Sequence, residues 1–335
     1  MTPALSIVMV SHGALGWTER ALAAVAEHTR AVHEVIVVDN ASTDGTPQRL
    51  RELPVRLIEN AENRGFGPAS NEGAEAARAP VLVFLNTDAL VEAGWDQPLL
   101  DAVATPGVAA AVPLVLELDG RIQCAGALLG RDGTVIEHGN GADPRDPAYR
   151  FPRAVDFGPG ACLAVRAEAF RAAGGFDAAY APAYYEDADL CLALAGRTLY
   201  VPAATIRHAK KASGGNELAQ QLSDRHRAFF AARWHERLAG RPSTLARPTP
   251  PLLLAARDAP ADGRVLVRDP AVLDALLAAR PFARVSLVGG DETWLARGVE
   301  LIDEHAAAAR AHHYDVELSA PPRDLARALA AGGLV

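Results

Sequence analysis

Residues 5–11 read LSIVMVS, residues 34–39 read EVIVVD and residues 80–86 read PVLVFLN. Each is a short run of apolar and β-branched side chains, the pattern of a strand that is buried on both faces. Helical patterns and one further short strand lie between them, at 17–28, 44–53, 55–59 and 67–78. This alternation predicts an α/β fold in which helices cover both faces of a parallel sheet.

Polar residues follow three of the predicted strands at the point where each strand ends. They are Ser11-His12, Asp39-Asn40 and Asn86-Thr87-Asp88. The carboxyl ends of parallel strands meet at one edge of the sheet, and open α/β sheets bind their ligands there. The sequence therefore predicts a ligand site at this edge.

Two of the strand ends have residues that suit a nucleotide. Asp39 can accept hydrogen bonds from ribose hydroxyls or from a base N–H, while the residues after it, 42–44, are typical helix caps. Residues 63–71, NRGFGPASN, open the next helix, where Arg64 can pair with a phosphate. This stretch is not a dinucleotide fingerprint, because Ser70 stands where the third glycine belongs.

Two further positions suit a divalent cation. The turn at Asn86–Asp88 fits Mg²⁺ or Mn²⁺, which takes one or two carboxylates and completes its shell with phosphate oxygens and water. An Asx turn that caps a helix over 91–103 is the alternative. His208 precedes a Lys/Ser/Gly stretch suited to phosphate and is a candidate metal or diphosphate ligand. A structural histidine, with Lys210 and Lys211 as a solvated pair, is the alternative there.

The densest acidic cluster lies in residues 184–191, YYEDADLC, with three carboxylates in four positions. Acidic residues are favoured at the start of a helix, but capping does not require three. Asp187 and Asp189 are two residues apart, so they leave a helix in different directions and have different roles. A carboxylate here can act as a general base, since an aspartate with an ordinary pKa near about 3.9 is already ionised at neutral pH.

After residue 108 the chain changes to short strands, glycine-rich turns and a long loop over 137–153, of the kind that is often functional. The pattern predicts strands at 160–165, 199–201 and 205–207, and helices at 167–173, 186–194 and 217–238. The proline-rich stretch 241–251 predicts a linker between two domains, 1–244 and 245–335. The second is a small α/β unit with elements at 264–268, 272–279 and 284–288, and 288–291 is either a phosphate turn or an ordinary turn.

Composition limits the class of protein. The chain has 335 residues, half of them hydrophobic, and a formal net charge of −8, which excludes a nucleic-acid binder that relies on a broad basic surface. Its three cysteines lack the spacing of a zinc site or a disulfide framework. With neither a signal-peptide pattern nor an apolar run of about 18 residues, a cytoplasmic protein is expected. Peripheral contact with a membrane and a homodimer are compatible with this.

A set of stretches recurs in this order in one known family: SIVMVSHG, VIVVDNASTDGT, NRGFGPASNEG, VLVFLNTD, GPGACLAVRAEAF, GGFDAAYAPAYYEDADLCL and YVPAATIRHAKKASGG. By these stretches, within residues 4–240, the chain resembles the family 2 inverting glycosyltransferases, in particular a rhamnosyltransferase-like branch. The resemblance implies the GT-A fold, in which helices flank a mixed, mostly parallel central sheet. It also implies transfer of a sugar from a UDP- or dTDP-linked donor to an acceptor hydroxyl, with a glycan, lipid-linked or small-molecule acceptor. Cell-surface glycan or secondary-metabolite glycoside synthesis is the expected setting.

The resemblance also implies roles for individual residues. Asp39 binds the base and ribose, Ser11 and His12 line the same pocket, and Asn63 and Arg64 lie at its edge. Asp88 takes the position of the metal-binding aspartate for Mg²⁺ or Mn²⁺, with His208 nearby. Asp187 takes the position of the catalytic base, and Glu186, Gly160 and Ala161 border the acceptor.

The sequence departs from the family pattern in three places. Asn86 replaces the first acidic residue of the metal turn, the segment between 190 and 200 is short, and residues after 244 match nothing. Two other functions therefore stay open. A sugar-phosphate nucleotidyltransferase would need a cationic loop after the first strand, and residues 11–16, SHGALG, have no Lys or Arg. A non-catalytic nucleotide-sugar-binding protein of the same fold is the other.

Overall fold

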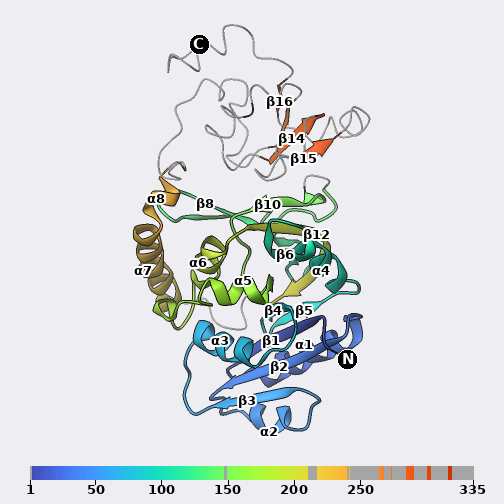
Figure 1. Cartoon of the computed structure of the whole chain (residues 1–335), viewed down its shortest axis with the longest axis vertical. Helices are drawn as coiled ribbons and strands as arrows, with labels where there is room; N and C mark the ends of the chain where they lie inside the picture. The colour runs from blue at the N-terminus through green and yellow to red at the C-terminus, as the bar shows by residue number, and fades with distance from the viewer. Residues whose placement is uncertain are drawn as a thin grey trace.

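In the computed structural model, residues 2–146, 149–209, 217–239 and 241 are described, together with short stretches at 264–267, 273, 284–289, 300–302 and 316–318 (Figure 1). A ten-stranded sheet forms the centre of the first part, with strand order β10-β12-β6-β11-β4-β1-β2-β3. In Figure 1 the labelled strands of this sheet run upward from β3 to β10 in this order. The sheet carries the predicted site along one of its edges.

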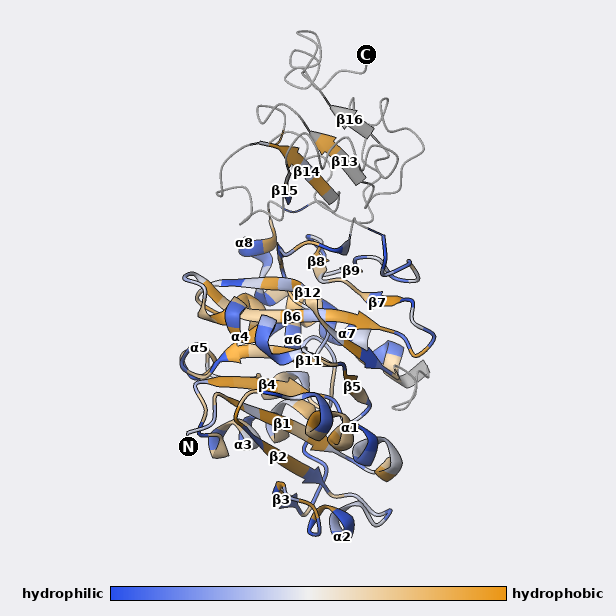
Figure 2. Cartoon of the chain, turned by 90° about the vertical axis from the view of Figure 1, so that its right-hand side faces the viewer, coloured by the Kyte–Doolittle hydropathy of each residue, from blue (hydrophilic) through white to orange (hydrophobic). Residues whose placement is uncertain are grey.

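Four neighbouring strands form a parallel block, as the apolar runs predict. β1 pairs in parallel with both β2 and β4, and β2 pairs in parallel with β3. Their side chains are buried on both faces in the centre of the block. Figure 2 shows these strands coloured as hydrophobic along much of their length. The bounds are β1 Leu5–Ser11, β2 His33–Asn40, β3 Arg56–Asn60 and β4 Val81–Leu85.

The predicted helices between these strands are present, as α1 Leu15–His28, α2 Thr46–Leu50 and α3 Phe66–Ala76. Helix α3 lies very close to β1 and β2 because Gly73 faces the sheet. A Cβ added at Gly73 would lie 2.4 Å from Cγ1 of Val8 and 3.3 Å from Cγ2 of Val38. The glycine therefore sets the distance between helix and sheet.

Substitution of Gly73 tests this packing. We expect Gly73→Ala to lower the free energy of unfolding by about 1–3 kcal/mol, because the overpacked methyl group outweighs the better helix propensity of alanine. Gly16, also in a helix, has no atom within 4 Å of an added Cβ. Gly16→Ala should leave stability unchanged or raise it by up to about 1 kcal/mol. Urea denaturation of both variants measures the difference, and equal effects would contradict the packing argument.

The other half of the sheet mixes directions. β11 is antiparallel to β4 and β6, β12 is parallel to β6, and β10 is antiparallel to β12. The small strands β5 and β7 pair with β12 and β6, and β8 and β9 form a separate hairpin. The bounds are β5 Ala89–Val91, β6 Val108–Leu116, β7 Ile122–Cys124, β8 Ala127–Leu129, β9 Val135–Glu137, β10 Arg153–Val155, β11 Cys162–Arg166 and β12 Arg197–His208. The helices are α4 Asp96–Ala104, α5 Ala167–Ala172 and α6 Glu186–Ala193, with a 3₁₀ turn at Ala178–Tyr180.

Two predictions in this half are wrong. The helix expected over 91–103 begins only at Asp96, because Ala89–Val91 pairs with the end of β12 and Gly94 then turns the chain at a φ of 79°. The strands expected at 199–201 and 205–207 are one strand, β12, whose register against β6 shifts between Val201 and Thr205. In both cases pairing between distant segments decides the structure.

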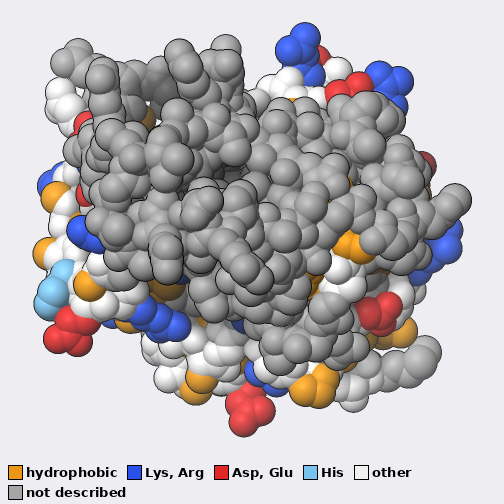
Figure 3. All heavy atoms as spheres, turned by 90° about the horizontal axis from the view of Figure 1, so that it is seen from above, with side chains coloured by type: hydrophobic (Ala, Val, Ile, Leu, Met, Phe, Trp, Pro, Cys, Tyr) orange, Lys and Arg blue, Asp and Glu red, His pale blue; other side chains and the backbone are white. Residues whose placement is uncertain are grey.

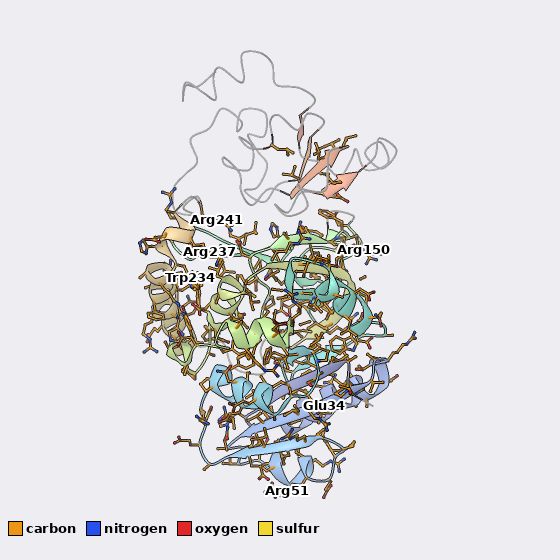
Figure 4. The ribbon with its side chains drawn as sticks, viewed as in Figure 1. Glu34, Arg51, Arg150, Trp234, Arg237 and Arg241 are labelled. Carbon is orange, nitrogen blue, oxygen red and sulfur yellow. The ribbon has the colours of Figure 1, made fainter. Side chains whose placement is uncertain are left out.

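The long helix predicted over 217–238 is divided into α7 Glu217–Arg233 and α8 His235–Leu238. At the junction, Trp234 donates its indole N–H to Asp189 over 2.7 Å, and Arg237 lies beside it (Figure 4). Asp189 also accepts a hydrogen bond of 2.9 Å from the Tyr180 hydroxyl. Asp189 thus connects α6 to the junction of α7 and α8, whereas Asp187 bonds to the backbone of Gly160 and Ala188, so the two carboxylates have different partners.

Beyond residue 263 the described stretches form a separate four-stranded parallel sheet, in the order β15-β14-β13-β16. The predicted strands near 264–268 and 284–288 are present. The bounds are β13 Arg264–Val267, β14 Arg284–Val288, β15 Glu300–Ile302 and β16 Val316–Leu318. The boundary at 244, most of the segment 272–279, and Gly290 and Asp291 lie outside the described residues.

The surface seen from above shows basic and acidic side chains interspersed around its described rim (Figure 3). None of the described helices combines the length and the apolar character that crossing a membrane requires.

Candidate active site

The ends of β1 and β2 are joined by a small polar network. Ser11 and Asp39 are register partners, and both are buried. The Asp39 carboxylate accepts hydrogen bonds from the Ser42 hydroxyl at 2.5 Å and from its backbone N–H at 3.0 Å. The Ser42 hydroxyl oxygen in turn accepts the N–H of Gly13 at 2.7 Å. Ser42, expected as a helix cap, instead holds the two strand-end loops together.

Asn40 connects this network to the loop before α3. Its amide nitrogen donates to Oδ1 of Asn63 at 2.9 Å and to the carbonyl of Gly65 at 3.1 Å, while its own oxygen accepts the N–H of Arg64. The exposed ring of His12 donates from Nδ1 to the Asn40 carbonyl at 2.7 Å. The predicted nucleotide-binding residues therefore lie in one connected set of loops.

The Arg64 guanidinium is paired in this structure. It forms an ion pair with Glu72 of α3 and remains 48% exposed. The neighbouring Gly65, at a φ of 84°, lies against a second segment, since an added Cβ would be 2.8 Å from Cα of Pro182. Phe66 donates its N–H to the Pro182 carbonyl at 2.8 Å. The loop before α3 thus contacts the segment that leads to Glu186 and Asp187.

Asp88 and His208 meet as the sequence suggests. Asp88 follows β4 and His208 ends β12, where it pairs with Ala89 of β5. Their side chains are nearly buried, and Nε2 of His208 lies 3.1 Å from Oδ1 of Asp88. The amide nitrogen of Asn86 lies 3.4 Å from the same Nε2. On the other side of the ring, Nδ1 donates to Oε1 of Gln123 at 3.1 Å.

This arrangement fits a cation. Because Nδ1 donates to Gln123, Nε2 is the ring nitrogen that faces the Asp88 carboxylate oxygen, and an imidazole nitrogen and a carboxylate oxygen placed side by side can share a metal ion. In addition, Oδ2 of Asp88 is buried without a hydrogen-bond partner. Within the described part of the chain no group of three His, Cys, Asp or Glu side chains gathers, so water and donor oxygens would have to complete the shell.

Asp187 is held at the start of α6 by two backbone groups. Its Oδ2 accepts the N–H of Gly160 at 2.9 Å, and its Oδ1 accepts the N–H of Ala188 at 2.8 Å. Burial nevertheless raises the pKa of Asp187 to about 6. The ordinary aspartate pKa that the sequence analysis assumed for a base in this cluster is therefore wrong for Asp187. Burial and the nearby charge of Asp187 raise the pKa of Glu186 well above its usual range. Oε2 of Glu186 is buried without a partner.

A short chain of contacts connects Asp187 to the Asp88 cluster. Gly160, which binds Asp187, precedes Ala161, whose carbonyl accepts the N–H of Asn86 at 3.0 Å. Asn86 in turn contacts His208. A Cβ added at Gly160 would be 3.7 Å from both Oδ2 of Asp187 and the Phe66 ring. The candidate base, the candidate metal ligands and the nucleotide loops thus meet at the edge that the sequence predicts. Lys210 and Lys211 lie outside the described residues.

The sequence gives little sign of two residues that support this site. Gln123 sits in a three-residue strand, and only its contact with His208 marks it. His226 lies within a helical pattern, yet its ring is buried against the segment before Glu186. Neither residue belongs to a motif, so only the folded chain identifies them.

The mixed, mostly parallel sheet with helices packed against it and polar strand ends along one edge is the GT-A fold. The fold is similar to a solved structure described as GalNAc-T7 with UDP, GalNAc and Mn²⁺, with a TM-score of 0.58 and 16% sequence identity, over 93% of this chain and 58% of that one.

Sequence comparison gives the family. The model described as Glycosyl transferase family 2 matches residues 6–120. The chain is 33% identical over 258 residues to the N-acetylglucosaminyl-diphospho-decaprenol L-rhamnosyltransferase of Mycobacterium tuberculosis, over 69% of this chain and 84% of that protein. It is 32% identical over 124 residues to the succinoglycan biosynthesis protein ExoO of Rhizobium meliloti, over 36% of each. The chain belongs to glycosyl transferase family 2 and is a glycosyltransferase, and transfer from a nucleotide-sugar donor is consistent with this.

Proposed function

We propose that the chain transfers a deoxyhexose or hexose, with L-rhamnose as the first candidate, from a UDP- or dTDP-linked donor to an acceptor hydroxyl with inversion. The observation that carries the proposal is the position of Asp187. Its carboxylate is oriented by the backbone N–H groups of Gly160 and Ala188. The contacts through Gly160, Ala161 and Asn86 described above connect it to the pair formed by Asp88 and His208. The choice of sugar rests on the mycobacterial relative, which is an L-rhamnosyltransferase by name.

In this proposal Asp187 accepts the proton of the acceptor hydroxyl as that oxygen attacks the anomeric carbon. A single displacement breaks the bond to the diphosphate, which leaves with its electron pair, and the configuration inverts. A carboxylate with a raised pKa is a stronger proton acceptor than an ordinary aspartate, provided that it is ionised. Glu186, Gly160 and Ala161 border the acceptor in this proposal.

On the donor side, the nucleoside binds to Asp39, Ser11 and His12 in this proposal. Asn63 and Arg64 lie at the edge of the same pocket. Arg64 would exchange Glu72 for a phosphate of the donor. Asp88 and His208, with Asn86 beside them, would hold Mg²⁺ or Mn²⁺, and the solved neighbour contains Mn²⁺. When bound, such an ion neutralises negative charge on the diphosphate leaving group.

The acceptor is the second part of the proposal. The name of the mycobacterial relative describes an acceptor in which N-acetylglucosamine is linked through diphosphate to decaprenol. We therefore propose a lipid-linked or glycan acceptor, with peripheral contact at a membrane if the acceptor is lipid-linked. A cytoplasmic location, a homodimer and an accessory role for residues 245–335 are further expectations.

Donor binding is the first test. Thermal-shift measurements with UDP- and dTDP-linked sugars, each with and without Mn²⁺, should single out one donor, because a ligand that binds only the folded state raises the Tm. That donor is then incubated with lipid-linked and glycan acceptors. Release of the nucleoside diphosphate is the expected product. Release of pyrophosphate from a nucleoside triphosphate would instead indicate a nucleotidyltransferase, and binding without turnover would indicate a non-catalytic protein.

The raised pKa of Asp187 predicts a pH dependence. A base must be deprotonated to act, so kcat should rise with pH through about 6 and fall to roughly a tenth of its plateau near about pH 5. Because Asp187 and Glu186 are adjacent carboxyls, the midpoint belongs to the pair. The measurement is kcat between about pH 5 and 8, with donor binding followed in the same buffers. A midpoint near about 4, the ordinary aspartate value, would contradict the assignment.

A further inference from the structure

The residues directly before Glu186 and Asp187 have an unfavourable backbone. Tyr184 and Tyr185 adopt φ values of 79° and 74° in succession. A side chain with a Cβ rarely takes this left-handed conformation, and two bulky residues in a row need support from their surroundings. Helix α6, with Asp187 in its first turn, begins immediately after them.

Helix α7 supplies that support through His226. The ring is only 2% exposed, and its Nδ1 lies 3.0 Å from the carbonyl oxygen of Ala183 and 3.1 Å from that of Tyr184. The guanidinium of Arg225 lies 3.1 Å from Nε2. An arginine only donates, so Nε2 is the acceptor and the proton is on Nδ1. The imidazole therefore holds two consecutive carbonyls with one N–H.

Neighbouring contacts fix the same turn from other sides. The ring of Tyr180 meets His226 edge-on, with a centroid distance of 5.6 Å. Tyr185 packs on the ring of Phe230 and donates its hydroxyl hydrogen to the Gly133 carbonyl at 2.8 Å. Of these groups, only His226 binds the backbone of the strained turn itself.

We propose that His226 is a positioning residue: its Nδ1–H holds the strained 183–185 turn and thereby fixes the Asp187 carboxylate against the acceptor hydroxyl. The role of Asp187 as base rests on the proposed function, whereas the action of His226 on the turn does not. Loss of the N–H leaves the turn free to relax. A displacement of the base by about 1 Å is enough to cost about 10²-fold in rate.

A matched pair of variants tests this. In His226→Asn the amide nitrogen is two bonds from Cβ, as Nδ1 is in histidine, so it can still donate to the two carbonyls. In His226→Gln it is three bonds from Cβ, at the position of Nε2. Both variants are polar and uncharged and both remove the imidazole ring, so any loss of stability or activity caused by removing the ring should be similar in the two. His235→Gln replaces an exposed histidine of α8. It is the control for replacing a histidine of α7 or α8 that does not contact the turn.

Two readouts are needed. Hydrogen–deuterium exchange over residues 183–188 should quicken in His226→Gln but stay close to the parent chain in His226→Asn and His235→Gln. With the donor identified above, kcat should fall about 10- to 100-fold in His226→Gln, with KM for the donor nearly unchanged, and be largely retained in His226→Asn. Equal exchange and equal kcat in the Asn and Gln variants would overturn the proposal. If the parent chain transfers no sugar, the proposed function fails, while the exchange data still decide the action of His226.

Discussion

Asp187→Asn should lower the rate of sugar transfer by about 10²–10⁴-fold while donor binding stays nearly intact. The substitution keeps the size of the side chain and removes the proton acceptor. The loops proposed to bind the donor contain Asp39, Asn40 and Asn63. The Asp187 carboxylate bonds instead to the backbone of Gly160 and Ala188. Steady-state assays should therefore show the loss in kcat, and calorimetric titration with the donor should show an unchanged Kd.

A second aspartate provides the control for charge. Asp224 is an exposed residue of α7 that pairs with Arg227, so Asp224→Asn removes the same charge away from the site. It should retain full activity. Full activity in Asp187→Asn would exclude this residue as the base and would direct the search to Glu186.

Asp88→Ala should weaken metal-dependent donor binding by about 10- to 100-fold, since it removes a charged ligand worth about 1.5–3 kcal/mol. It also leaves His208 facing an apolar methyl group. The effect should appear only when Mn²⁺ or Mg²⁺ is present, so the donor titration is repeated in a chelator. In the chelator, parent and variant should bind the donor with similar affinity.

The matched control is Asp119, an exposed aspartate in the turn before β7. Asp119→Ala should bind the donor as the parent chain does, with and without metal. A metal response that persists unchanged in Asp88→Ala would rule out Asp88 as a metal ligand.

The parallel half of the fold could be predicted from sequence because each of its strands carries its own signal. The runs at 5–11, 34–39 and 80–86 have apolar, largely β-branched centres, and helical patterns lie between them. The wrong predictions concern strands whose pairing partners are distant in the sequence. Ala89–Val91 becomes a strand because the end of β12, more than a hundred residues later, pairs with it. No local pattern contains that information.

The site follows the same rule. Strand ends and the acidic cluster pointed to Asp39, Asp88, Asp187 and His208 because their residue types and positions are visible in the chain. Their partners are not visible there. Glu72 binds Arg64, Gln123 orients His208, and the pKa of Asp187 is raised by the protein packed around it. Each of these depends on three-dimensional neighbours.

Strand β12 has a consequence for the synthesis of the protein on the ribosome. It lies between β10 and β6 and also pairs with β5, so three earlier segments have to wait for residues 197–208 before their hydrogen bonds are complete. A nascent chain that stalls before this point presents a long apolar edge at β6, the kind of edge that recruits chaperones or associates with other chains. Truncated products of this gene should therefore collect in the insoluble fraction, while chains released after β12 should not.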